Sequence, residues 1–277
     1  MIIDSHQHFW RYKQEEYGWI DSSMEVLKRD YLPEELAQEI RGAGVAGTVA
    51  VQARQNVREI KWLLELADNH PFIKGVVGWV DLCSEELREQ LEAYSGHPKL
   101  VGVRHVIHDE PDDDFMLREE FTRGVSLLAE FGLSYDLLIF PRHLGRAIQL
   151  TGMFPGQRFV LDHLAKPSIR SGALHPWKEG ILELAGQPNV WCKISGMVTE
   201  ADHQRWEFRD FIPYLESVYE AFGPDRVILG GEWPVCRLAG EYREIMQIPL
   251  RFLESFDETE RSKILFRNVA DCYQLNF

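Results

Sequence analysis

The chain has 277 residues, a length that suits one large α/β domain or two small ones. Its formal net charge is −14 and its isoelectric point is about 5.2, and no basic tract offsets this acidity. An acidic surface repels phosphate backbones and anionic lipids, so we expect neither nucleic acid nor a membrane as a partner. No apolar run approaches the length that spans a bilayer.

The four cysteines, Cys83, Cys192, Cys236 and Cys272, are scattered and form no C-x-x-C pair. This spacing indicates neither a disulfide framework nor a zinc ribbon. The first residues also lack the basic and apolar regions of a signal peptide. Both observations favour the reducing cytoplasm as the location of the protein.

Short apolar runs rich in Val, Ile and Leu alternate along the chain with segments whose apolar residues recur three and four positions apart. The runs are residues 2–5, 47–52, 73–80, 100–106, 133–140, 158–163, 190–195 and 227–231, and the helical segments include 33–42, 59–69, 84–95, 115–131 and 210–222. Strands that are apolar throughout and alternate with helices predict a parallel sheet. Eight such units over this length predict an α/β fold, a (β/α)8 TIM barrel, possibly distorted, that forms one domain over residues 1–277. A doubly wound open sheet is the alternative, although no Gly-x-Gly-x-x-Gly loop follows any run.

The first apolar run ends in two histidines, His6 and His8. Side chains alternate across a strand, so we expect both imidazoles on one face. Two imidazoles aimed at one point predict a metal site or a proton-transfer site. The segment 11–31 that follows is long and aromatic. We expect Trp19 and its neighbours either to cover the mouth of the barrel or to pack against the outer helices.

Active sites of such barrels lie at the carboxyl ends of the strands, so polar residues at these ends are candidates for chemistry. They are His6 and His8, Gln52 and Arg54, Trp79 and Asp81, Arg104, His105 and His108, Tyr135 and Asp136, Asp162, His163 and Lys166, Lys193 and Ser195, and Glu232 followed by Trp233. Together they would give a pocket that mixes imidazoles, carboxylates and cations.

Four of these residues allow a sharper prediction. Because neighbouring side chains in a strand alternate, we assign His163 to the site and Asp162 to the face that meets the helices. Lys193 lies in an apolar run, and lysine is almost never buried alone, so we expect a ligand or a carboxylate beside it. Arg104 suits a carbonyl or carboxylate oxygen.

Seven motifs occur in a fixed order along the chain. They are DSHQHFW from Asp4, VQAR from Val51, GVR from Gly102, YD from Tyr135, LDHLAKP from Leu161, CKISG from Cys192 and EWPVC from Glu232. With this ordered set the chain resembles the sugar lactonase branch of the amidohydrolase superfamily, in particular lactonases of the L-fuconolactonase and L-rhamnonolactonase type. The resemblance covers essentially the whole chain. It implies a barrel hydrolase that opens a small-molecule sugar lactone to the aldonic acid.

The resemblance implies that a carboxylate after the eighth strand is the general base that activates water. The usual motif there is Gly-Ser-Asp-Trp-Pro, and this chain has Gly-Gly-Glu-Trp-Pro at residues 230–234. Glu232 therefore carries the carboxylate one methylene further than the expected aspartate. A misplacement of about 1 Å can cost roughly 100-fold in rate. The change is compatible with lower activity, a shifted substrate or a deliberate alteration of the chain.

The resemblance also implies roles for the other candidates. Arg104 and His163 are expected to stabilise the oxyanion, and the expected substrate contacts are His6, His8, Trp19, Gln52, Tyr135, Lys193 and Trp233. Metal-dependent relatives use a histidine on the fifth strand, where this chain has Tyr135 and Asp136. We therefore expect either no required cofactor or one divalent ion such as zinc, held by His6, His8 and Glu232, with His163 as a further possible ligand.

Two other functions stay open at this point. A metal-dependent decarboxylase can be built on the same barrel, and it would need a tightly bound ion. A lactone-binding protein that has lost its base is the non-enzymatic alternative. The sequence leaves the sugar, the ring size and the choice between a monomer and a homo-oligomer open.

Overall fold

The computed structural model describes residues 1–276, and Phe277, the last residue of the predicted domain, lies outside this range. Eight strands form one sheet in which every neighbouring pair is parallel and the order follows the chain from β1 to β8. The strands are β1 (Ile3–Gln7), β2 (Gly47–Val51), β3 (Ile73–Gly78), β4 (Leu100–His105), β5 (Ser134–Leu137), β6 (Phe159–Leu161), β7 (Val190–Ile194) and β8 (Val227–Leu229). The predicted (β/α)8 barrel is confirmed.

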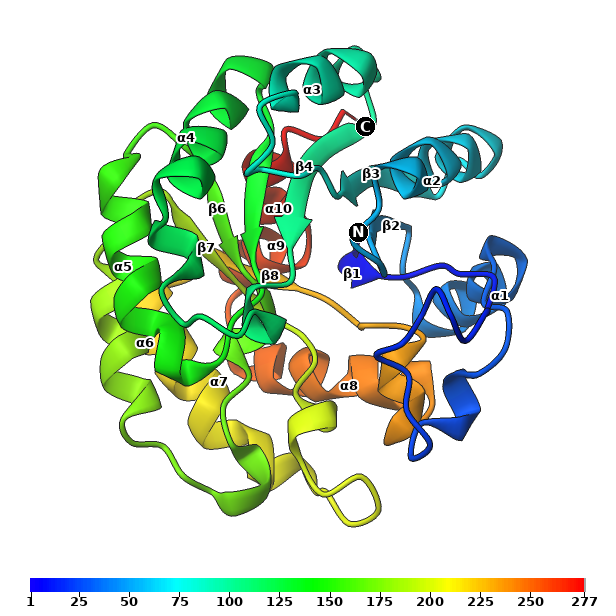
Figure 1. The fold of residues 1–277 in the computed structure, drawn as a ribbon. Coiled ribbons are helices and arrows are strands. Elements are labelled where there is room, and N and C mark those ends of the chain that lie inside the picture. The colour runs from blue at the N-terminus through cyan, green and yellow to red at the C-terminus, as the bar shows by residue number, and fades with distance from the viewer. Residues whose placement is uncertain (277) are drawn as a thin grey trace.

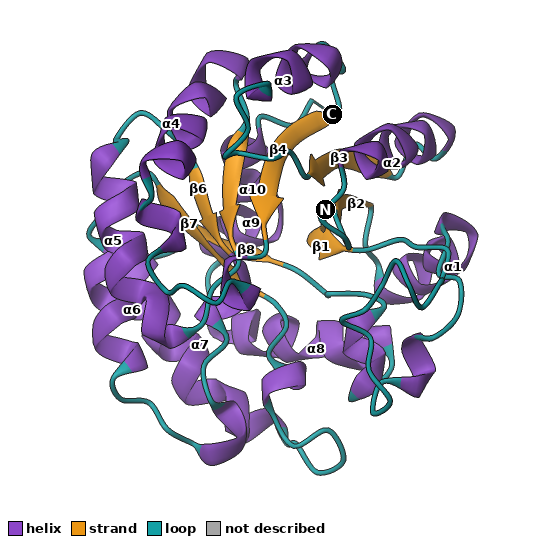
Figure 2. Ribbon diagram, viewed as in Figure 1, coloured by secondary structure: helices purple, strands orange, loops and turns teal. Residues whose placement is uncertain are grey.

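Helices encircle the strands (Figures 1 and 2). They are α1 (Pro33–Ala43), α2 (Val57–Asn69), α3 (Leu87–Ser95), α4 (Glu119–Leu128), α5 (Leu144–Met153), α6 (Trp177–Ala185), α7 (Phe208–Phe222), α8 (Tyr242–Phe252), α9 (Glu258–Ser262) and α10 (Asn268–Tyr273). The helix predicted at 115–131 is shorter, because residues 115–117 form a separate 3-10 turn. Within residues 1–276, no helix is long and apolar enough to cross a membrane.

Helix α2 shows how the local sequence builds one of these layers. The side chain of Asn56 accepts a hydrogen bond from the backbone N–H of Arg58 and so caps the helix start. Ile60, Leu63 and Leu64 recur at helical spacing and are buried. This apolar stripe packs against the sheet, and its burial stabilises the helix in place.

The interior of the barrel forms a second apolar cluster, separate from the layer under the helices. It joins alternate strand residues such as Val49, Val51 and Ile228 to Val269 and Tyr273 of α10. Figure 1 shows α10 behind the strands, at the centre of the ring. The C-terminal helix therefore closes the barrel at the amino ends of the strands, and the carboxyl ends are left for the site.

The seam between the first and last strands is closed by residues beyond β8. The backbone N–H of Glu232 donates to the His6 carbonyl at 2.7 Å, and that of His8 donates to the Trp233 carbonyl at 2.7 Å. An isolated parallel bridge joins Gln7 to Trp233. Strands β1 and β8 are thus joined by segments that carry predicted site residues, among them His6, His8 and Glu232.

Candidate active site

Three imidazoles and one carboxylate meet at the carboxyl ends of the strands. The Nε2 atoms of His6 and His8 lie 3.2 Å apart, and the rings of His6 and His163 have centroids 4.3 Å apart. Nε2 of His163 lies 3.3 Å from Oε1 of Glu232. All four side chains are buried. The structure therefore brings together four of the predicted site residues.

A bulge in β1 aims the two histidines into the barrel. Asp4 pairs with Thr48 and Gln7 with Ala50, so β1 uses one residue more than β2 between these pairs. Asp4 faces outward and accepts a hydrogen bond from Tyr242 of α8. Regular alternation from Asp4 would place His6 and His8 outward as well, and the extra residue reverses their direction.

His163 enters the site from an unusual turn. Residues His163, Leu164, Ala165 and Lys166 all have left-handed backbone angles, with φ between 52° and 58°. This conformation costs roughly 1–2 kcal/mol for each non-glycine residue, so the surroundings must hold it. Trp177 Nε1 donates to the Leu164 carbonyl at 2.6 Å, and Nδ1 of His163 lies 2.9 Å from Oγ of Ser195.

The predicted orientation of Asp162 is wrong. Its carboxylate lies inside the barrel, 3.0 Å from Nη1 of Arg104 and 2.9 Å from Nζ of Lys193. Strand β6 ends at Leu161, which faces outward, so Asp162 points inward by alternation. The left-handed turn then brings His163 to the same side, which alternation alone does not allow.

Lys193 lies beneath the imidazoles in a fully buried ionic cluster. Its ammonium contacts Asp136 at 2.6 Å, Asp162 at 2.9 Å and Nδ1 of His6 at 3.2 Å. Nδ1 of His6 also lies 3.4 Å from Oδ1 of Asp162, and a proton on Nδ1 that faces this carboxylate leaves Nε2 as the acceptor nitrogen. The expected carboxylate partner of Lys193 is therefore present, and its expected contact with substrate stays a prediction. Tyr273 of α10 donates to Asp136 at 2.7 Å and completes the cluster from below.

Tyr135 does not reach the site. It lies next to Asp136 in β5 and therefore points to the opposite face. Its ring contacts Phe121 of α4 and Phe159 of β6, with centroids 5.9 and 6.2 Å away. The expected substrate contact of Tyr135 is wrong, because this side chain belongs to the apolar layer under the helices.

The remaining predicted residues surround the imidazoles. Nη2 of Arg104 donates to the Gln52 carbonyl at 2.7 Å. Trp19 is half-buried, and its indole N–H donates to the Ala53 carbonyl at 2.9 Å, which ties the aromatic segment to the end of β2. Trp233 is buried against Phe9 and Tyr31. The aromatic segment thus both lines the strand ends and packs into the core.

Burial sets the protonation of these groups. It raises the pKa of Glu232 to about 7, although the charge of Lys166 opposes this shift. It lowers the pKa of His6 to about 3 and holds those of His8 and His163 well below the ordinary value. The site therefore presents three neutral imidazoles beside a carboxylate that titrates near neutrality, the range in which a general base is most effective.

Several buried polar atoms at the strand ends have no hydrogen-bond partner within residues 1–276. They are both amide atoms of Gln52, Nε of Arg104, Nδ1 of His108, Oε2 of Glu232 and Nε1 of Trp233. Leaving a buried donor or acceptor unpaired costs about 1–3 kcal/mol, so such atoms are expected to meet a ligand or water. The set contains donors and acceptors, as a polyhydroxylated ligand requires.

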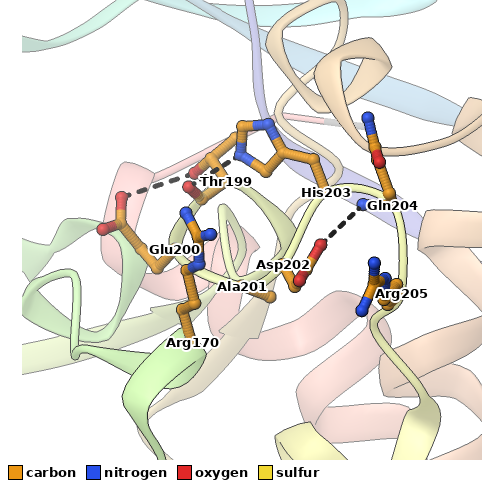
Figure 3. Close-up of a pocket in the computed structure, with 8 residues that line it drawn as sticks. All are labelled: Arg170, Thr199, Glu200, Ala201, Asp202, His203, Gln204 and Arg205. Atoms are coloured by element: carbon orange, nitrogen blue, oxygen red, sulfur yellow. Dashed lines mark hydrogen bonds between the residues drawn. The ribbon is translucent and has the colours of Figure 1, made fainter.

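A surface pocket of about 660 Å³ lies on the loop after β7 (Figure 3). Residues 199–205 of the loop after β7 line it, together with Arg170 from the loop after β6. Glu200 lies in this lining and forms an ion pair with Lys166, the last residue of the left-handed turn. This ion pair links the lining of the pocket to the turn that carries His163.

Comparison with known proteins places the chain. A family profile described as amidohydrolase matches residues 3–275. The chain belongs to the amidohydrolase family. It is 40% identical to an L-fucono-1,5-lactonase from Burkholderia multivorans over 284 aligned positions, which cover 99% of this chain and 96% of the relative. A crystal structure of an amidohydrolase from Burkholderia multivorans with bound zinc is 39% identical, covers 100% of both chains and superposes with a TM-score of 0.96.

A more distant structural neighbour bears on the decarboxylase alternative. The structure of a 5-carboxyvanillate decarboxylase from Sphingomonas paucimobilis covers 99% of both chains with a TM-score of 0.66. It is only 13% identical to this chain. At that level the likeness is one of fold, and fold alone does not imply function.

The donor set of this amidohydrolase fits one divalent ion. The 3.2 Å between Nε2 of His6 and Nε2 of His8 is close to the spacing of two nitrogens bound at about 2.0–2.1 Å to one tetrahedral zinc. Nδ1 of His8 lies 2.9 Å from the Val51 carbonyl, which favours a proton there and leaves Nε2 as a ligand atom. Within residues 1–276, the group of ligand atoms that all lie within 4.8 Å of one another is that of His6, Asp162 and His163, which differs from the predicted set of His6, His8 and Glu232. Arg104 Nη1, 3.3 Å from Nε2 of His6, competes for the same nitrogen.

Sequence reasoning missed or undervalued three residues of this site. Tyr273 lies on a short terminal helix, and no local pattern marks it as part of the barrel interior. Asp162 could be listed as a strand-end carboxylate, but alternation between Asp162 and His163 predicted the outer face for it, because the sequence does not show the left-handed turn. Ser195 was noted only as a strand-end residue, and its contact with His163 depends on the left-handed turn.

Gly196 allows a test of whether the positions of Glu232 and His163 determine activity. A Cβ at this position would lie 2.5 Å from Nδ1 of His163 and 3.0 Å from Oε2 of Glu232, and the backbone is left-handed with φ of 60°. We expect Gly196→Ala to lower kcat roughly 100-fold and the free energy of unfolding by about 1–2 kcal/mol. Gly96→Ala is the matched control, because φ is −69° and nothing lies within 4 Å. Unchanged turnover of Gly196→Ala would contradict the site geometry.

Proposed function

We propose that this amidohydrolase opens a polyhydroxylated sugar lactone, of the L-fucono-1,5-lactone type, to the corresponding aldonic acid. The observation that carries the proposal is Glu232, a buried carboxylate with one free oxygen beside a neutral histidine at the strand ends. A relative at 40% identity over nearly the whole chain is an L-fucono-1,5-lactonase, which supports the same substrate class here.

In the proposed reaction, Glu232 accepts a proton from water as the water oxygen attacks the lactone carbonyl carbon. The negative charge that develops on the carbonyl oxygen is stabilised by Arg104, whose Nε has no partner within the described residues, and by His163. The bond between the carbonyl carbon and the ring oxygen then breaks. The leaving oxygen takes the proton from Glu232, which regenerates the base and releases the aldonic acid.

Other residues bind and orient the substrate. The amide of Gln52 and the indole N–H of Trp233, which have no hydrogen-bond partner within residues 1–276, would contact ring hydroxyls. His6 and His8, whose Nε2 atoms lie 3.2 Å apart, would contact the substrate from the end of β1, and Trp19 would do so from the aromatic segment beside the end of β2. The buried setting excludes water from the reacting groups other than the one that attacks, and it strengthens their electrostatic interactions.

We further propose that one divalent ion such as zinc can bind His6, His8 and Glu232 but is not required for turnover. A bound ion would polarise the lactone carbonyl. Arg104 already places a positive charge 3.3 Å from His6, and it can stabilise the carbonyl oxygen without an ion.

We also propose that the protein is located in the cytoplasm. Its four cysteines form no disulfide in the described structure, which suits a reducing compartment.

The test is turnover of a lactone panel. The 1,5- and 1,4-lactones of L-fuconic and L-rhamnonic acid are offered to the purified protein, and release of acid is followed with a pH indicator. We expect hydrolysis above the uncatalysed rate, and the same rate within about twofold after exhaustive dialysis against a chelator, with the metal content measured in parallel. No hydrolysis by the wild type or by Glu232→Asp would refute the function, and loss of activity on chelation would refute the optional ion.

A further inference from the structure

His108 lies at the mouth of the barrel and has no role in the reaction proposed above. It follows β4 in the 3-10 turn Ile107–Asp109. Its backbone N–H donates to the carbonyl of Leu138, the residue after β5, at 3.2 Å. Its ring stacks on Phe140, with centroids 4.7 Å apart and planes 18° from parallel. The imidazole is therefore held between the carboxyl ends of β4 and β5.

The loop that carries His108 is anchored to the start of α5. Oδ1 of Asp113 lies 2.9 Å from Nε of Arg142 and 3.0 Å from Nε2 of His143. Asp114 contacts Arg146 at 2.7 Å. Asp113 and Asp114 thus fix this loop against the neighbouring one. A side chain on such a fixed loop is preorganised for binding.

One nitrogen of His108 has no partner. Nε2 lies 3.3 Å from Oδ1 of Asp109, and a proton on that nitrogen faces the carboxylate. Nδ1 is then an acceptor, and it is buried without a donor within residues 1–276. Burial, with the positive charges of Lys166 and Arg104, lowers the pKa of His108 to about 3 and keeps the ring neutral. His108 follows β4 by three residues, and Arg104 near the end of the same strand lies 3.3 Å from Nε2 of His6, so His108 lies at the mouth that holds the imidazoles.

The chemistry of the missing partner follows from this geometry. A buried acceptor needs a donor, and in a sugar lactone the ester oxygens only accept hydrogen bonds. The ring hydroxyls are the donors that such a ligand offers. We propose that His108 accepts a hydrogen bond from one ring hydroxyl of the lactone and so selects hydroxylated over unsubstituted lactones. This inference rests on the proposed function and assigns to it a residue that determines specificity.

The experiment compares His108→Phe with the wild type on three kinds of lactone. Phenylalanine keeps a ring on Phe140 and removes the acceptor nitrogen. The lactones are L-fucono-1,5-lactone, its analogues that each lack one hydroxyl at C2, C3 or C4, and δ-valerolactone, which has the same ring and no hydroxyl. We expect kcat/KM of the variant to fall roughly 10- to 100-fold on the first. On δ-valerolactone and on one deoxy analogue, we expect the variant and the wild type to agree within about twofold.

His97→Phe is the matched control, because His97 is also paired with an aspartate, Asp68, but precedes β4 and lies at the opposite end of the strands. It should change no kcat/KM value. An equal loss by His108→Phe on all lactones would show a packing role and overturn the inference, and so would no loss on any of them.

A second measurement separates this inference from the proposed function. Binding of L-fuconate, the open-chain product, and of its deoxy analogues is measured by calorimetry. If the wild type opens no lactone, the proposed function fails. The role of His108 would still be supported if His108→Phe bound L-fuconate more weakly than the wild type does, but bound one deoxy analogue equally well. Equal binding by the two proteins, or none by the wild type, would overturn it.

Discussion

Glu232→Gln is expected to lower kcat by about 10²–10⁴-fold, the usual contribution of a positioned general base. Glutamine has the size of glutamate and can still contact His163, but it cannot take a proton from water. The fold should be unaffected, because the seam contacts of residue 232 use its backbone N–H. Steady-state kinetics on the lactone that the wild type turns over best is the measurement.

Glu59→Gln is a matched control for this variant. Glu59 is the other buried glutamate with a strongly raised pKa, about 8, and its carboxylate accepts backbone N–H groups of Ala53 and Arg54. Its replacement should leave kcat within a few-fold of the wild-type value. Glu232→Asp keeps the carboxylate and should lose less activity than Glu232→Gln. Wild-type kcat in Glu232→Gln would exclude Glu232 as the base.

The pH profile follows from the same residue. The active form of a general base is the deprotonated form, and burial raises the pKa of Glu232 to about 7. We therefore expect kcat/KM to rise about tenfold per pH unit below pH 7 and to level off above it. The residual activity of Glu232→Gln should lack this limb. A wild-type profile that is flat between pH 5 and 8 would contradict the assignment.

Lys193→Met is expected to lower the free energy of unfolding by about 3–5 kcal/mol. The change removes the cation that lies between Asp136 and Asp162 and leaves two carboxylates buried without it. Methionine fills a similar volume, so the loss reports the missing charge rather than a cavity. Denaturant unfolding followed by circular dichroism measures the effect.

Lys178→Met is the control for that variant, because Lys178 pairs with Glu220 at 2.9 Å on the surface of α6. Exposed ion pairs contribute little, so a much smaller loss is expected there. Equal losses for the two variants would contradict the view that the buried cluster holds the barrel interior together.

Much of this site could be predicted from the sequence, for a physical reason. The apolar runs and helical periodicities depend on local spacing, and a parallel barrel brings its strand ends together whatever the side chains are. His6, His8, Arg104, His163 and Glu232 could therefore be expected at one mouth. The motif after the eighth run also marked Glu232 as the departure from the usual aspartate. Lys193 could also be expected to have a carboxylate partner, because it lies in an apolar run and lysine is almost never buried alone.

The faces on which these residues lie were decided by tertiary structure. The bulge in β1 reverses the direction of His6 and His8, and the left-handed turn after β6 puts Asp162 and His163 on one side. Both depart from regular alternation, and neither has a local sequence signature. They persist because distant groups hold them, such as the Trp177 indole on the Leu164 carbonyl.

The sequence by itself thus determined the barrel, the mouth where chemistry occurs and the kinds of groups gathered there, because these follow from short-range pattern. Only the folded chain decided which side chains meet. Tyr273, 137 positions from Asp136, joins the ionic cluster through a terminal helix, and Tyr135 turns away from it. Contacts of that sequence separation depend on how the barrel closes, and no local rule contains that information.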